Sequence, residues 1–101
     1  MAVNKDSEKY LERALCEGIK KMGGHAYKFV SPNHRGVPDR ICIIPERADV
    51  IFVELKSKGK KPSPLQEIEI QRLRDLGQTV VVIDNYEDLE DYLFDWQPRP
   101  F

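Results

Sequence analysis

Long hydrophobic runs are missing from this 101-residue sequence. The apolar stretches, such as Val80–Ile83, are far shorter than the roughly 20 residues that a membrane-spanning helix requires. The polar N-terminus, MAVNKDSEKY, also lacks the apolar centre of a secretory signal. These absences argue against a membrane protein and lead us to expect a cytoplasmic location.

Cysteine is scarce as well, since Cys16 and Cys42 are the only two thiols. They form none of the spacing motifs that bind metals, and disulfides are rare in cytoplasmic proteins. We expect both thiols to be buried as small apolar side chains. The length, with 41% hydrophobic and 33% charged residues, fits one globular domain over residues 1–101.

The net charge is only −1, so the overall charge does not indicate a nucleic-acid-binding protein. The distribution is nevertheless uneven. Residues 56–61, KSKGKK, hold four lysines and follow Lys28, Arg35 and Arg40, whereas residues 84–95 hold six acids and no base. The lysine-rich segment is therefore either a solvated loop or a surface that binds a polyanion.

Hydrophobic periodicity predicts seven elements. They are a helix over 7–22, strands over 26–31, 39–44 and 50–56, a helix over 63–76, a strand over 79–83 and a helix over 86–94. The last strand is apolar on both faces, which is typical of a central strand. This order predicts an α/β fold with a mixed sheet flanked by helices on both faces.

Each long helix shows a recognisable pattern. The apolar residues of the first recur on one face, at Leu11, Leu15, Ile19 and Met22. The second begins at Ser63-Pro64, ends before Gly77, and has Leu65, Ile68, Leu73 and Leu76 as apolar residues. Both helices are expected to pack against the sheet.

The third predicted strand ends in two charged residues, Glu54 and Lys56, whose side chains emerge on the same face. If the turn of the preceding hairpin is centred between Glu46 and Arg47, Asp39 lies directly opposite Glu54. Two adjacent carboxylates repel each other unless a cation lies between them, and Mg²⁺ suits such a site. Lys56 would then neutralise the pentavalent phosphate or orient the attacking water.

A cross-strand salt bridge of Lys56 with Asp39 or Glu54 is the alternative interpretation. The turn before Asp39 favours a functional site. Gly36 permits an unusual backbone there, and Pro38 forces the preceding residue to be extended. Together they aim Asp39 rigidly, which a surface salt bridge would not require.

Three further polar residues allow two interpretations on pattern alone. Glu8 lies near the centre of the inward stripe of the first helix, so it either stabilises the helix dipole or points into the site. Glu12 lies on the flank of that stripe, where the dipole interpretation fits better. Gln66, in the first turn of the second helix, reads as a solvated amide.

At these residues the sequence resembles a known family. Gly36-Val37-Pro38-Asp39, Phe52-Val53-Glu54-Leu55-Lys56 and Ser63-Pro64-Leu65-Gln66 resemble the VRR-NUC (virus-type replication-repair nuclease) family of the PD-(D/E)xK nuclease superfamily. The likeness extends from Glu8 through the strand at 79–83. It implies a restriction-endonuclease-like αβββαβ core.

The resemblance also implies roles for individual residues. Asp39 and Glu54 match the family's metal-binding acids, the carbonyl of Leu55 is a further metal ligand, and Lys56 matches the catalytic lysine. Gln66 matches the family's glutamine behind the site, which changes the interpretation given by pattern alone. Glu8 matches the acid of the first helix, although Glu12 is an alternative for that role. The implied cofactor is Mg²⁺ or Mn²⁺.

The activity implied is a metal-dependent DNA endonuclease. Short stand-alone members resemble homodimeric Holliday-junction resolvases and are often carried by phages, so we expect a homodimer acting on branched DNA in a bacterial or infected-cell cytoplasm. From the distribution of charge, the residues expected to bind nucleic acid are Lys28, Arg35, Lys58, Lys60 and Lys61, and the three loop lysines should contact phosphates. A monomeric nicking or flap nuclease, and a non-catalytic DNA-binding module of the same fold, are the alternatives. The intact catalytic residues argue against the last of these.

Overall fold

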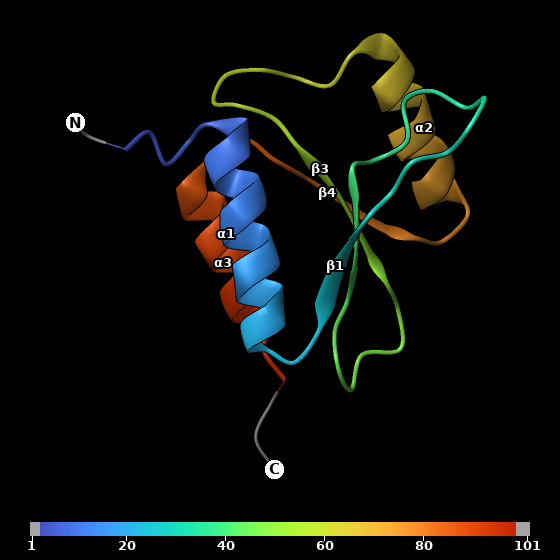
Figure 1. The fold of residues 1–101 in the computed structure, drawn as a ribbon. Helices are drawn as coiled ribbons and strands as arrows, with labels where there is room; N and C mark the ends of the chain where they lie inside the picture. Colours follow the sequence, from blue (N-terminus) through green and yellow to red (C-terminus); the bar gives the residue numbers. More distant parts are fainter. Residues whose placement is uncertain (1–2, 99–101) are drawn as a thin grey trace.

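The computed structural model describes residues 3–98. Its elements are α1 (Glu8–Lys21), β1 (His25–Lys28), β2 (Arg40–Ile43), β3 (Ile51–Leu55), α2 (Pro64–Asp75), β4 (Thr79–Ile83) and α3 (Tyr86–Asp95). The order of helices and strands is the predicted one, and the α/β fold with a mixed, helix-flanked sheet is confirmed (Figure 1).

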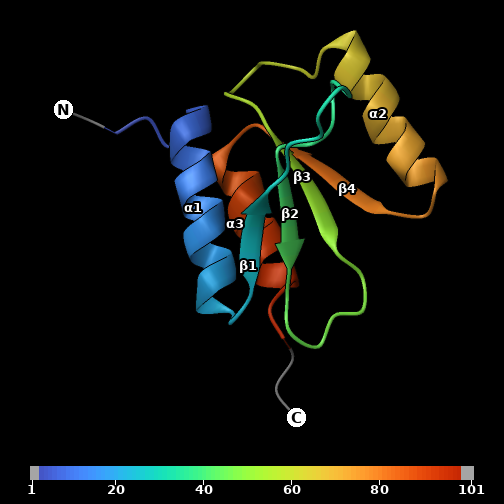
Figure 2. The same ribbon diagram turned by 45° about the vertical axis from the view of Figure 1, so that its right-hand side comes forward.

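The sheet has the spatial order β1-β2-β3-β4 (Figure 2). Its first three strands pair antiparallel, whereas β4 runs parallel to β3. A parallel neighbour requires a crossover, and α2 supplies it. Helices α1 and α3 lie side by side on one face of the sheet, and α2 lies on the other (Figure 1).

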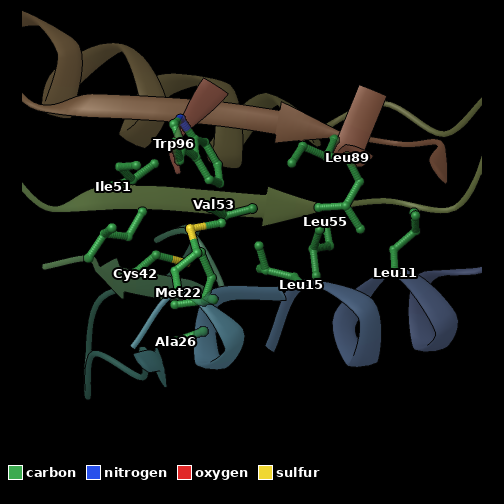
Figure 3. Packing of buried hydrophobic residues seen from close by; sticks show 13 residues of the cluster. Leu11, Leu15, Met22, Ala26, Cys42, Ile51, Val53, Leu55, Leu89 and Trp96 are labelled. Carbon is green, nitrogen blue, oxygen red and sulfur yellow. The ribbon is translucent and has the colours of Figure 1, made fainter. Parts of the chain in front are cut away.

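Side chains of β3 alternate between these two layers. Ile51, Val53 and Leu55 face α1 and α3, where they belong to the main core (Figure 3). The intervening Phe52 belongs to a smaller cluster with residues of α2 and β4. By the same alternation Glu54 lies on the α2 face. The sequence of β3 therefore places a carboxylate on the side of the sheet that α2 covers.

Three sequence predictions about elements need correction. The strand predicted over 26–31 is shorter, because the chain leaves the sheet after Lys28 and turns towards α2. The strand at 79–83 is not central but lies at the edge of the described sheet. Both of its faces are apolar because α2 packs on one face and α3 on the other, not because a strand pairs with each of its edges. In α2, Leu65 and Ile68 stay exposed, as does the C-cap Leu76, and Glu69 and Ile70 are the buried residues.

Other predictions about the interior hold. Leu11, Leu15, Ile19 and Met22 of α1 are all buried, as their spacing predicts. Cys16 and Cys42 are free thiols; Cys42 is buried as predicted, whereas Cys16 is only partly buried. Between residues 3 and 98, no helix combines the length and apolar character needed to cross a bilayer.

Candidate active site

Asp39 and Glu54 face each other at one end of the β2–β3 hairpin. Arg40 pairs with Val53, so the next pair outward joins residues 39 and 54, the predicted register. Opposed residues of antiparallel strands share a face of the sheet. Glu54 is only 1% exposed, whereas Asp39 lies exposed just before β2 begins. The backbone of Asp39 is fixed from the other side, because its carbonyl accepts a hydrogen bond from the N–H of Phe29 at 2.8 Å.

The two oxygens of Glu54 have different surroundings. Oε1 accepts a hydrogen bond from Nε2 of Gln66 at 2.9 Å and lies 3.7 Å from Nζ of Lys56. Oε2 is buried and has no hydrogen-bond partner among the described residues. A buried carboxylate oxygen without a partner is costly, so this atom marks a place for a cation.

The cap of α2 fixes the direction of Gln66. The N–H of Ser63 donates to Oε1 of Gln66 at 2.9 Å, and the N–H of Gln66 donates to Oγ of Ser63 at 3.2 Å. This is a capping box, with Pro64 at the first helical position. Because its carbonyl oxygen serves the cap, the amide nitrogen of Gln66 must point to Glu54. Gln66, predicted as a catalytic residue, thus makes its contact with a carboxylate and positions it.

Burial weakens the acidity of both carboxyl groups. Burial, followed by the charge of Asp39, raises the pKa of Glu54 to about 7, although Lys56 opposes the shift. Partial removal from water also raises the pKa of Asp39, against the effects of the Leu55 backbone N–H and Lys56. Perturbed, facing carboxyl groups of this kind are typical of functional sites.

The residues present fit a hard divalent cation. Within residues 3–98, no three Asp, Glu, His or Cys side chains gather closely enough to form a metal centre by themselves. Mg²⁺, however, is commonly held by one or two carboxylates and completes its shell with water and phosphate. The N–H of Leu55 faces Asp39, and the N–H and carbonyl of one strand residue point to the same neighbouring strand. The Leu55 carbonyl is therefore directed to the Asp39 side, as its predicted ligand role requires.

The acids of the first helix lie near this pair but form no metal-binding cluster with it among residues 3–98. Glu8 is exposed in the first turn of α1, near enough for its charge to raise the pKa of Glu54 slightly, but outside any metal-binding cluster. Glu12 forms an ion pair with Arg40, whose Nη1 also donates to the carbonyl of Ala26 at 3.2 Å. Glu12 is thus paired with Arg40, although its charge also contributes to raising the pKa of Asp39. The role of Glu8, with Glu12 as its alternative, stays a prediction.

The predicted DNA-contacting residues are exposed on loops and strand ends around the site. Lys28 ends β1, Arg35 lies in the loop before Asp39, and Lys58, Lys60 and Lys61 lie in the loop between β3 and α2. Lys58 also donates its N–H to the carbonyl of Asp6 at 3.1 Å, and its Nζ lies 3.6 Å from the Asp6 carboxylate. Contact with DNA stays a prediction for all five.

Two ion pairs near the site have no signal in the sequence pattern. One is Glu12 with Arg40, and the other joins Nε2 of His34 to Oε1 of Glu69 at 2.8 Å. Glu69 is 6% exposed although it lies in a helix whose apolar residues are partly in solvent. Only the packing of α2 on the sheet reveals that this acid points inward.

Comparison with known proteins identifies the family of this chain. The model of the VRR-NUC domain matches residues 3–85. The chain is 48% identical over 86 residues, 85% of its length and 90% of the relative's, to "Putative nuclease p44" of Acyrthosiphon pisum secondary endosymbiont phage 1. It is 35% identical over 72 residues to a UPF0102 protein of Thermotoga petrophila, covering 70% of this chain and 64% of that one. A solved VRR-NUC domain superimposes with a TM-score of 0.81 at 27% identity, covering 93% of this chain and 99% of that one. The chain therefore belongs to the VRR-NUC domain family of nucleases.

Proposed function

We propose that this domain is a metal-dependent DNA endonuclease, which hydrolyses phosphodiester bonds at a site formed by Asp39, Glu54 and Lys56. The observation that carries the proposal is the state of Glu54. One of its oxygens is held by Gln66 and Lys56, while the other is buried without a partner on the face it shares with Asp39. The arrangement leaves a carboxylate pair prepared for a cation.

The residues divide the work of hydrolysis. When bound, Mg²⁺ or Mn²⁺ supplies Lewis acidity and lowers the pKa of water. Asp39, Glu54 and the Leu55 carbonyl would hold the ion. The Lys56 ammonium, on the same side as Glu54, would neutralise the charge that develops on the phosphate and orient the attacking water. Gln66 would keep Glu54 from rotating away.

The finer part of the proposal concerns the substrate. We expect a homodimer that cuts branched DNA in the manner of a Holliday-junction resolvase. Resolving a four-way junction requires two symmetric cuts, and two-fold pairing of identical subunits is the commonest way to provide two sites at fixed separation. A monomer that nicks DNA or cuts flaps is the alternative.

A cleavage panel tests the proposal. The protein is incubated with labelled four-way junction, flap, single-stranded and duplex DNA, with Mg²⁺, with Mn²⁺ and with a chelator. Asp39→Asn protein purified in parallel is the control, because a contaminating nuclease would cut in both preparations. We expect cleavage only with metal and only by the wild type, with junctions preferred. Equal cleavage in chelator, or by Asp39→Asn, would refute metal-dependent cleavage at this site.

A further inference from the structure

Glu69 is a buried acid that the proposed chemistry does not use. It lies on the inward side of α2, next to the apolar cluster that contains Ile70. Its Oε1 lies 2.8 Å from Nε2 of His34 and 3.7 Å from Nη1 of Arg72. Buried carboxylates are rare unless they are paired, so a specific contact must account for this residue.

His34 belongs to the loop over residues 30–38, which we call the Asp39 loop because it delivers Asp39 to the start of β2. The loop has no regular secondary structure and lies alongside α2 in both views (Figure 1 and Figure 2). Besides the contact of His34 with Glu69, Gly36 approaches the backbone of Leu65 so closely that an added Cβ would lie 2.8 Å from its carbonyl oxygen. These two contacts with α2 thus fix the position of the Asp39 loop.

The same helix also holds the second carboxylate. Gln66 and Glu69 are three residues apart, so they project from the same side of α2. Gln66 holds Glu54, and Glu69 holds the loop that ends at Asp39. An ion of the size of Mg²⁺ demands ligands at about 2.0–2.1 Å in nearly ideal octahedral geometry, so a small change in the relative position of the two acids matters.

We propose that Glu69 and His34 are a positioning pair, which sets the distance between Asp39 and Glu54 and thereby the metal affinity of the site. This inference rests on the proposed function. Neither residue belongs to the proposed set of metal ligands; they act through the Asp39 loop. The contact joins a buried acid to a half-exposed histidine, whose side chain is 44% exposed. Replacing Glu69 therefore leaves His34 in contact with solvent and not as an unpaired buried group.

The test compares variants with matched controls in two measurements. Glu69→Ala and His34→Ala break the contact, Glu69→Gln retains an acceptor oxygen for His34, and Glu67→Ala and His25→Ala change exposed residues of the same types. Hydrogen exchange of the metal-free protein should show faster exchange of the Asp39 loop amides in the two breaking variants alone. Calorimetric titration with Mn²⁺ should show affinity about tenfold weaker in those variants, within the range seen for outer-shell changes. Glu69→Gln should bind nearly as the wild type does.

The double variant His34→Ala/Glu69→Ala separates a shared contact from general damage. If the pair acts through one contact, the double variant should lose as much Mn²⁺ affinity as either single variant, and not the sum of the two single losses. Unchanged loop exchange in His34→Ala, or faster exchange with wild-type Mn²⁺ affinity, would overturn the inference. Failure of the wild type to bind Mn²⁺ would instead overturn the proposed function, whatever the loop does.

Discussion

Glu54 shows how one residue can oppose stability and serve function. It is buried, one of its oxygens has no partner among residues 3–98, and its pKa is raised to about 7, first by burial and then by Asp39. Without a cation, the ionised form is unfavourable in the folded protein. The protein keeps this carboxylate in place through Gln66 and Lys56. Such a conflict is expected where charge is arranged for binding and not for folding.

Replacing Glu54 by glutamine should therefore stabilise the metal-free protein at high pH. The pKa of Glu54 rises on folding from 4.5 to about 7, so the folded state binds more protons than the unfolded state between these values. Stability contributed by this group is then lost as pH rises through that window. Thermal melts in chelator should give a higher Tm for Glu54→Gln at pH 8 and equal Tm values near pH 4.5. A wild type that is the more stable at pH 8 would contradict this account.

Lys56 should matter for chemistry and little for folding. Its side chain is 20% exposed, and its Nζ lies 3.7 Å from Oε1 of Glu54. We expect Lys56→Ala to abolish cleavage while far-ultraviolet circular dichroism and most of the DNA affinity remain. Fluorescence anisotropy with labelled DNA measures the binding. Wild-type turnover by the variant would remove Lys56 from the catalytic assignment.

Helix α2 is the element that organises the site. Its capping box orients Gln66 towards Glu54, and its backbone at Leu65 lies against Gly36 of the Asp39 loop. Ile68, which is 55% exposed, projects from the opposite side of the helix to Gln66. The helix that forms the crossover to β4 thus also positions both carboxylates, Glu54 through Gln66 and Asp39 through its loop.

Gly36 gives a direct measure of the contact between α2 and the Asp39 loop. Gly36 and Gly59 have nearly the same left-handed backbone, with φ of 87° and 80°, but a Cβ at Gly59 would meet nothing within 4 Å. Gly59→Ala should lower the free energy of unfolding by about 1–2 kcal/mol, the strain of the backbone alone. Gly36→Ala should lower it clearly more, because its Cβ would lie 2.8 Å from the Leu65 carbonyl oxygen. Urea titrations of both variants make the comparison, and equal losses would mean that the loop does not press on α2.

At the scale of the whole molecule, charge is separated around the sheet. Exposed basic residues surround the end where Asp39 and Glu54 meet, whereas the acids of residues 84–95 lie on and beside α3, on the other face. This separation allows a polyanion to approach the site despite a net charge of −1.

The loop between β3 and α2 should contribute phosphate contacts. Lysine supplies charge without base recognition, so each lost contact should reduce the slope of log affinity against log salt by about 0.9 on duplex DNA. We expect a smaller slope for Lys58→Ala/Lys60→Ala/Lys61→Ala than for Lys9→Ala/Lys20→Ala/Lys21→Ala, which removes equal charge from α1. Lys58 should contribute least, since Asp6 already pairs with it. Matching slopes for the two triple variants would mean that the loop faces away from DNA.

The proposed dimer is the last prediction at this scale. Of the aromatic residues near the C-terminus, Tyr92 and Trp96 pack on the main core and are therefore not a free dimer surface. Trp96 is 7% exposed and stacks with Tyr92 at 5.3 Å, which leaves Phe94 exposed. Light scattering at micromolar concentration should nevertheless give twice the monomer mass. A monomer that also fails to cut junctions would favour the nicking or flap nuclease.

The sequence by itself determined the order of elements, the inward face of α1 and the register of the β2–β3 hairpin. These depend on local periodicity and on counting across one turn, both of which the chain carries directly. The pairing of Asp39 with Glu54 follows from that register. The family motifs could be recognised for the same reason, and the family model matches residues 3–85.

Tertiary structure alone decided what surrounds those residues. Periodicity indicates that both faces of β4 are covered, but it cannot show whether a strand pairs with each of its edges. The prediction of a central strand at 79–83 is therefore wrong. Nor can it show that Glu69 points inward while Leu65 and Ile68 stay exposed, because the inward side of α2 depends on where the crossover places the helix. The pairing of Glu12 with Arg40 and of His34 with Glu69 joins residues far apart in the chain. Such contacts arise only when the layers pack.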